Sequence, residues 1–165
     1  MNKKLAIGLL PVVAIALVGF FAFRPNNTGI IQAPAEANLN TDEWLVKDIT
    51  SNDTLVVERG REQRREQRGV KLCGIQSVTE STEAIEQFLA ASNNRVEIAF
   101  LGQADETWIG EVWVNAATEQ EEILNGLVIL EGLAVVDEDE WMSCPNQPAL
   151  ADAQDIFLER RKTAN

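Results

Sequence analysis

The chain has 165 residues, enough for one folded domain and a short extension. It carries 26 acidic and 14 basic residues, for a net charge of −12, and it has no histidine. So acidic a chain repels the phosphate backbone, which makes nucleic acid a poor candidate partner. Histidine is the commonest general base and metal ligand near neutral pH. Without it, catalysis would have to rest on carboxylates, lysine, arginine or thiols.

A membrane-spanning helix is predicted at the N-terminus, over residues 1–23. Residues 5–23 are uncharged and mostly apolar, and a helix needs roughly 20 such residues to cross a bilayer. Lys3 and Lys4 precede this run, and positive charge there favours a cytoplasmic N-terminus. We therefore expect a single-pass membrane protein whose C-terminal domain is extracytoplasmic, in a periplasm or a lumen.

A cleaved signal peptide is the alternative interpretation of the same segment. The small residues at 33–37 suit a cleavage site, but they lie well beyond the usual distance from the apolar run. We favour the anchor. Residues 24–42, rich in Asn, Pro and Ala, are then a linker, and residues 43–165 form the folded domain.

Local patterns predict strands and helices in a definite order along this domain. Short runs rich in β-branched residues, separated by turn residues, predict strands at 44–49, 53–58, 69–75, 95–101 and 106–114. Apolar residues at helical spacing predict helices at 81–93, 121–136 and 148–165. The order is three strands, a helix, two strands and two helices.

One segment, residues 59–69, concentrates positive charge in this acidic chain. Its five arginines are Arg59, Arg61, Arg64, Arg65 and Arg68. One interpretation is a basic contact surface for an anionic partner such as phosphate or lipid headgroups. The other is the solvated tip of a long hairpin.

Three stretches, in this order, resemble the staphylococcal-nuclease-like (thermonuclease) family. Residues 44–57 read W-x-V-x-x-I-x-x-x-D-T-L-V-V, residues 70–75 read V-K-L-x-G-I, and residues 128–136 read V-I-x-x-G-L-A-x-V. The resemblance covers about residues 44–162. It implies an α+β, mainly β fold, in which three helices surround a five-stranded OB-type barrel.

For active members, the resemblance implies phosphodiester hydrolysis assisted by Ca²⁺, with carboxylate ligands, a glutamate base and two arginines on the phosphate. This chain departs from that pattern. Asp53 keeps one metal-binding carboxylate, whereas Gln76 replaces the second and Thr79 replaces the base. Lys71 and Ile109 stand where the arginines belong. We therefore expect a remnant site with no catalytic residue, no bound metal and no cofactor.

Glu80 is the residue that would rescue this site, through a shift of the loop by one position. The alternative is a helix-capping role, because residues 77–80 read S-V-T-E, the S-x-x-E pattern of a capping box. We favour capping. The alternative function is a divergent Ca²⁺-dependent phosphodiesterase that uses Asp53, Lys71 and Glu80.

The expected function is protein binding, as an accessory or assembly component of a membrane complex. OB-type barrels offer a concave strand face and loops that other functions can reuse. Three tryptophans suit an interface, and filling the core is their alternative role: Trp108, Trp113 and Trp141.

The two cysteines, Cys73 and Cys144, fit an oxidising compartment, in which an even number of cysteines allows a disulfide. Strand alternation would turn Cys73 and Lys71 towards the same cleft. In the fold that the resemblance implies, the connection between the last two helices runs beside that cleft. We therefore predict a Cys73–Cys144 disulfide that fastens this connection, with two separate buried thiols as the alternative.

Overall fold

The structure is a computed structural model and describes residues 40–60, 64–80, 82–116 and 118–164. The expected anchor at 1–23 and nearly all of the expected linker lie outside these residues. Within the described part of the chain, no helix has both the length and the apolar character that crossing a bilayer requires.

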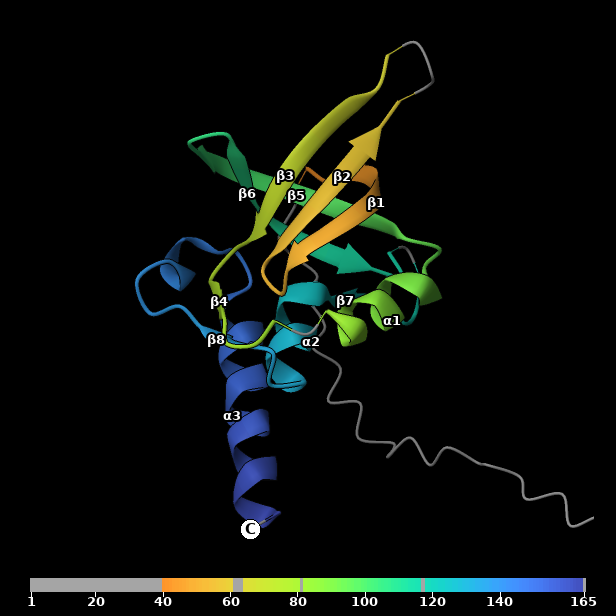
Figure 1. The fold of residues 1–165 in the computed structure, drawn as a ribbon. Coiled ribbons are helices and arrows are strands. Elements are labelled where there is room, and N and C mark those ends of the chain that lie inside the picture. The colour runs from red at the N-terminus through yellow and green to blue at the C-terminus, as the bar shows by residue number, and fades with distance from the viewer. Residues whose placement is uncertain (1–39, 61–63, 81, 117, 165) are drawn as a thin grey trace, which may run out of the picture.

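Five strands form a closed barrel in the upper part of Figure 1. They are β1 (Asp42–Ser51), β2 (Thr54–Arg59), β3 (Glu66–Leu72), β5 (Arg95–Ala104) and β6 (Thr107–Val114). The strand order is β3-β2-β1-β5-β6, with antiparallel neighbours, and a parallel pairing between β3 and β6 closes the circle. The expected five-stranded, mainly β architecture is confirmed, and it is consistent with an OB-type fold.

The parallel pairing of β3 with β6 is short and will be called the seam. It runs from the pair Gly69–Thr107 to the pair Leu72–Gly110. Just past it, the Cys73 amide donates to the Gly110 carbonyl at 2.9 Å. A slip of the seam by one residue would turn every buried side chain of one strand outward, so alternation in the sequence fixes its register.

Alternating apolar residues explain why each barrel strand forms. Most strands contribute side chains at every second position to the buried core, for example Leu55 and Val57 on β2 and Val96 and Ile98 on β5, whereas β6 is buried on both faces from Gly110 to Val114. The intervening residues of β2 and β5 are more exposed, as expected for strands that cover a core on one face.

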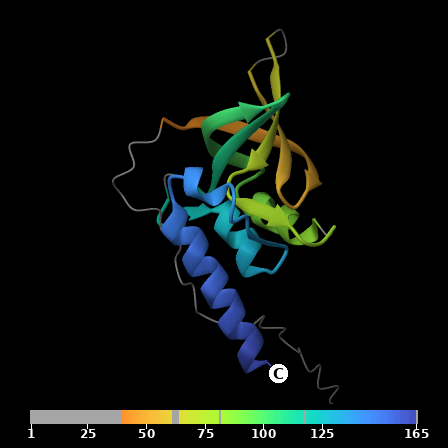
Figure 2. The same ribbon diagram turned by 90° about the vertical axis from the view of Figure 1, so that its left-hand side faces the viewer.

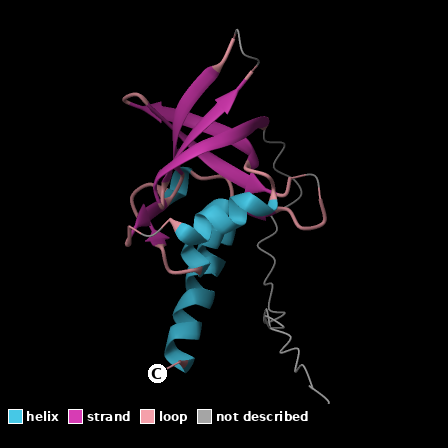
Figure 3. Ribbon diagram, turned by 45° about the vertical axis from the view of Figure 1, so that its right-hand side comes forward, coloured by secondary structure: helices cyan, strands magenta, loops and turns pink. Residues whose placement is uncertain are grey.

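Three helices gather at one end of the barrel (Figure 3): α1 (Glu83–Ala91), α2 (Leu124–Leu130) and α3 (Gln147–Thr163). α1 buries Ile85 and Leu89 against the barrel. It ends where Asn93 and Asn94 take left-handed backbone angles, with φ of 56° and 59°. Asparagine tolerates that conformation better than most residues, so it stops the helix where the sequence predicted.

The helix expected at 121–136 is wrong at both of its ends. Its first residues form β7 (Glu122–Ile123) beside β6, and its last form β8 (Ala134–Val136), which pairs with β4 (Ile75–Ser77). α2 stops because Gly132, with φ of 71°, donates to the Ile129 carbonyl while the next amide bonds Val128. This is a Schellman motif, which needs a residue that accepts a left-handed conformation.

The connection between β8 and α3 contains the short 3₁₀ helix η1 (Trp141–Ser143). α3 follows it, packs its first turns on α2 and then projects away from the barrel, as Figure 2 shows in blue. Its start is anchored by Glu111 of β6, a fully buried carboxylate that accepts hydrogen bonds from the Asn146 amide at 2.7 Å and from its side chain at 2.5 Å. Asn146 is the N-cap of α3, where negative charge is favourable.

We expect the stability of the folded protein to depend on pH through Glu111. Burial raises the pKa of its carboxyl above the ordinary value near 4.5, although the Asn146 hydrogen bonds oppose the shift. The folded protein therefore holds this proton more tightly than the unfolded chain does. The stabilising contribution of the proton is complete below the unfolded pKa and is lost as pH rises through the folded pKa.

Urea unfolding of the wild type and of Glu111→Gln between about pH 4 and pH 8 checks this expectation. The free energy of unfolding of the wild type, relative to that of the variant, should fall as pH rises. An exposed, uncharged substitution on α1, Gln87→Asn, is the control and should show no such trend. A difference between wild type and Glu111→Gln that stays constant with pH would contradict the expectation.

Candidate functional site

The expected remnant site lies at the end of the seam. Lys71 of β3 and Ile109 of β6 are direct neighbours across it. Asp53, in the turn between β1 and β2, reaches the same place, because its carbonyl accepts the Leu72 amide at 2.6 Å. The fold therefore brings together three positions that are far apart in sequence.

Both oxygens of the Asp53 carboxylate accept hydrogen bonds from neighbouring residues. One oxygen accepts the hydroxyls of Ser51 at 2.5 Å and Thr54 at 3.0 Å, and the other accepts the Ser77 amide at 3.4 Å. These bonds hold the turn against the start of the loop that follows β4. Asp53 thus has a complete structural role in this geometry.

The other two expected positions lie on β4 and on the loop that follows it. Gln76 is exposed on β4, opposite Val135 of β8. The carbonyl of Thr79 accepts the side-chain amide of the buried Asn52 at 2.6 Å. The loop is therefore tied to the Asp53 turn through its backbone, and Gln76 contributes an amide where the family pattern has a carboxylate.

The capping box expected at 77–80 is not formed. Ser77 belongs to β4, and its hydroxyl donates to the Thr79 carbonyl at 2.8 Å. α1 begins later, with Thr82 as its N-cap, and Thr82 donates to Glu86 at 3.4 Å. The S-x-x-E pattern does not mark a helix start here, because pairing with β8 keeps the chain in a strand through Ser77. Glu80 is exposed.

The connection between β8 and α3, residues 137–146, closes over the seam end. Glu140 accepts a hydrogen bond from the Lys71 ammonium at 2.7 Å, and this pair is only partly exposed. The Asp137 amide donates to the Gly74 carbonyl at 3.0 Å. An acidic residue of the connection therefore pairs with Lys71 at the seam end.

The same connection is fastened covalently. Cys73 and Cys144 form a disulfide with Cα atoms 5.9 Å apart, as predicted. Both cysteines are buried, so the bond lies in the core and not on the cleft face with Lys71. The reason is that β3 ends at Leu72, and strand alternation no longer applies at Cys73. Gly74 allows the close approach, since a Cβ there would lie 2.7 Å from the Cys144 sulfur.

A buried asparagine that sequence reasoning missed completes the seam end. Asn125 of α2 accepts the Val112 amide at 3.1 Å and donates to the Cys73 carbonyl at 3.0 Å and the Gly110 carbonyl at 3.4 Å. Its side chain forms hydrogen bonds with backbone groups at the point where the pairing of β3 with β6 ends. Buried polar groups need such partners. The only signal in the sequence is a polar residue inside an apolar helix.

Metal-ligating side chains do not converge within the described residues, where no three of His, Cys, Asp or Glu form a group that could hold an ion. At the seam end, the carboxylates of Asp53 and Glu140 each already accept hydrogen bonds from protein groups.

The arginine-rich segment forms the β2–β3 hairpin, and most of its described charges are paired. Glu66 accepts hydrogen bonds from Arg59 at 2.8 Å and Arg68 at 2.7 Å, and these two bonds, Arg59 first, lower the pKa of its carboxyl. Arg59 also bonds Asp42, and Arg65 lies 3.9 Å from Glu58. The hairpin therefore presents less unpaired positive charge than its sequence indicates.

Two further arginines complete the segment. Arg64 is exposed near the hairpin tip, whereas Arg61 lies outside the described residues. Most of the described charged side chains of this segment thus form hydrogen bonds or ion pairs with other side chains. Its tip is the place where positive charge remains accessible.

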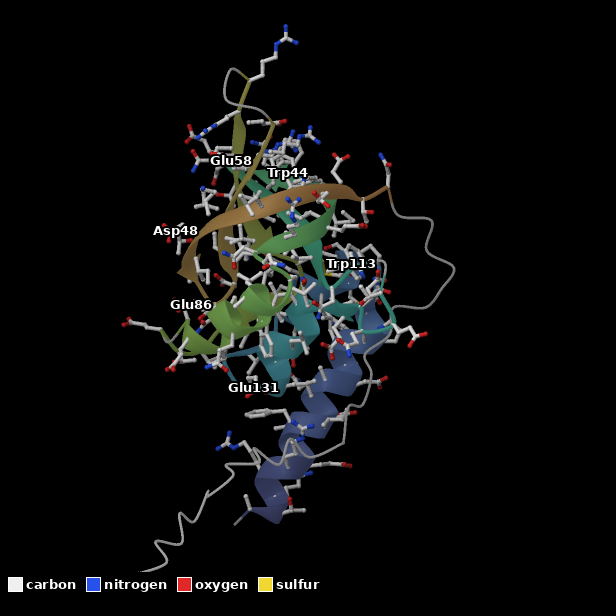
Figure 4. The ribbon with its side chains drawn as sticks, turned by 90° about the vertical axis from the view of Figure 1, so that its right-hand side faces the viewer. Trp44, Asp48, Glu58, Glu86, Trp113 and Glu131 are labelled. Atoms are coloured by element: carbon white, nitrogen blue, oxygen red, sulfur yellow. A yellow bond between two sulfur atoms is a disulfide. The ribbon has the colours of Figure 1, made fainter. Side chains whose placement is uncertain are left out.

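Aromatic rings hold Arg68 at the hairpin end of the barrel. Its guanidinium lies over the rings of Trp44, Phe100 and Trp108, at 5.0, 4.7 and 4.2 Å from their centroids. The Trp44 label marks this end in Figure 4. Arg68 thus fills space between strands with a cation on aromatic faces, which is an attractive arrangement.

The tryptophans expected at an interface are mainly structural. Trp113 is buried in the core, so the interface interpretation is wrong for it. Trp108 is half-buried and packs on Phe100 and Arg68. Trp141 is half-buried on η1, next to Gly74.

Compared with models of known protein families and with curated proteins, the chain matches neither a family nor an individual protein. The resemblance to staphylococcal-nuclease-like domains therefore rests on the three stretches of sequence named above. In the structure, these stretches form β1 with β2, the end of β3 with the start of β4, and the end of α2 with β8.

The disulfide predicts a large dependence of stability on redox state. It links residues 71 positions apart, and closing a loop of that size stabilises the folded state by about 4 kcal/mol in the chain-entropy model. The double variant Cys73→Ser/Cys144→Ser should lose about this much free energy of unfolding in urea. Wild type treated with reductant is the matched control and should behave alike. Equal stability of oxidised and reduced wild type would contradict the expectation.

The aromatic contacts predict that two arginines of one hairpin differ in their effect on stability. Arg68→Ala should lower the free energy of unfolding by about 2 kcal/mol, because it removes cation–π contacts and packing. Arg64→Ala, at an exposed site, should change it by less than about 0.5 kcal/mol. Urea unfolding followed by tryptophan fluorescence measures both. Similar losses for the two variants would show that Arg68 does not stabilise the barrel end.

Proposed function

We propose that this chain is a non-catalytic, staphylococcal-nuclease-like module that is tethered to a membrane and binds another protein. In this proposal residues 1–23 are the anchor and the barrel domain is extracytoplasmic. The partner is a component of a membrane complex that the module helps to assemble or to support. The order of three family-like stretches and the apolar N-terminal run support this reading.

The ion pair between Lys71 and Glu140 is the observation that supports the proposed loss of catalysis. A phosphate group would need that cation, and an acidic side chain of the same molecule already holds it at 2.7 Å. The connection that supplies Glu140 is fixed by the disulfide four residues further on. A fixed negative charge at this place repels a phosphodiester, and electrostatic stabilisation of the phosphoryl group is the main catalytic contribution in such chemistry.

The buried disulfide also supports the proposed location. Disulfides persist in oxidising compartments such as the periplasm or a secretory lumen, and they are rare in the cytosol. The net charge of −12 supports a protein partner over a nucleic acid one, because an acidic surface opposes phosphate backbones.

Phosphodiesterase assays test the loss of catalysis. The full-length chain, incubated with single-stranded DNA and Ca²⁺, should show no turnover above a protein-free control. Removal of one donor to the phosphate costs about 10²–10³ in rate in comparable electrostatic roles. Glu140→Gln, which releases Lys71, should not restore activity, because the base is still missing. Turnover that disappears with a chelator and with Asp53→Ala would overturn the proposal.

Isolation from membranes tests the binding role. The chain should remain in the membrane fraction with residues 1–23 in its intact mass. After solubilisation it should elute in a complex larger than its own 18.2 kDa, with a stoichiometric protein partner. A soluble, monomeric chain that starts near Asn38 would overturn the anchor and the assembly role together.

A further inference from the structure

Strand β1 has an open backbone edge over its second half. Its first half pairs with β5 from Asp42 to Leu45, and the Val46 amide then donates to the Asn94 carbonyl at 2.8 Å. Asn93 and Asn94, which have left-handed backbone angles, lie between the end of α1 and the start of β5. Among the described strand pairs, β1 beyond Val46 is therefore partnered on the β2 side alone.

This edge and helix α1 form the two walls of an open groove with a volume of about 350 Å³. Lys47, Asp48 and Ile49 line it from the strand, and Glu86 and Leu89 line it from the helix. Figure 4 shows Asp48 and Glu86 on these neighbouring elements at the same side of the molecule. Its apolar residues are Val46, Ile49 and Leu89, of which Ile49 is the one that is only half-buried.

A local, exposed hydrogen bond lies at this part of β1. The Ile49 amide donates to the carboxylate of its own neighbour, Asp48, at 3.0 Å. A bulge at Lys47 shifts the pairing of β1 with β2 just before this residue. The carbonyl of an added strand can replace such a side-chain acceptor without breaking the barrel ladder.

The charge on the groove points to the kind of segment that fits it. Asp48 and Glu86 are exposed, and no ion pair between described residues uses either of them. Lys47 is the single cation lining the groove. A segment with basic residues therefore complements the two carboxylates, and an apolar residue between them can contact the half-buried Ile49.

We propose that this groove binds an extended, cationic segment of a partner protein, which adds as a short strand to residues 47–50 of β1. The inference rests on the proposed protein-binding role and assigns it a surface. The bulges at Lys47 and Thr50 restrict the addition to a few residues, because bulges interrupt a regular ladder. Opposite charges then select the partner, as electrostatic complementarity does at interfaces.

A peptide titration tests this directly on the isotope-labelled full-length chain. The probe is a short capped peptide of alternating lysine and valine, and its counterpart replaces lysine with glutamate. The lysine peptide should shift the amide signals of residues 46–50 and 86–94 and slow hydrogen exchange at Ile49. The glutamate peptide should do neither. Shifts confined to another acidic region, such as 137–140, would overturn the proposal.

Charge reversal separates the groove from general acidity. The double variant Asp48→Lys/Glu86→Lys should weaken binding of the lysine peptide by at least about tenfold. The matched control, Asp152→Lys/Asp155→Lys on the exposed side of α3, changes the net charge equally and should bind as wild type does. Equal weakening in both variants would mean non-specific attraction. Concentration-dependent dimers that form through this edge without peptide would identify a second copy as the occupant and overturn the proposal.

The outcomes also separate this inference from the proposed function. Ca²⁺-dependent turnover of DNA would refute the non-catalytic role, whatever the peptide does. A protein partner that copurifies equally with wild type and with Asp48→Lys/Glu86→Lys would leave the binding role in place and refute the groove as its site.

Discussion

The parallel pairing of β3 with β6 is the constraint on which the rest of the molecule depends. It closes the barrel over only four residue pairs, and beyond it the buried backbone needs other partners. The Asn125 side chain supplies them by bonding groups of both chain segments. This closure also places two residues of the candidate site, because Lys71 and Ile109 are adjacent only when β3 and β6 meet.

Carboxylates stabilise this acidic protein at three places, each in a different way. Glu140 pairs with a lysine over the seam end, Glu66 joins two arginines of the hairpin, and Glu111 anchors the start of α3. The first two pairs are partly exposed and contribute modestly to stability, while their geometry decides which cations remain accessible. The third is buried, and its hydrogen bonds offset part of the cost of burial.

Periodicity in the sequence predicted most elements because it reports directly on one-sided burial. It failed where two elements share an apolar run: residues 121–136 read as one helix, yet Gly132 ends α2 and the residues after it pair with β4. The S-x-x-E pattern at 77–80 failed for a related reason, since pairing with β8 holds Ser77 in a strand. Local signals describe what a segment prefers, and long-range pairing overrides them.

The sequence by itself determined that the five barrel strands and three helices exist, because burial patterns are local properties of a segment. It also indicated the Cys73–Cys144 bond once a fold was assumed. Only the tertiary structure decided that Lys71 meets Glu140, that Arg68 lies among three aromatic rings and that β1 keeps an open edge. Lys71 and Glu140 are 69 residues apart. Such contacts depend on how the barrel closes, and no local pattern records that.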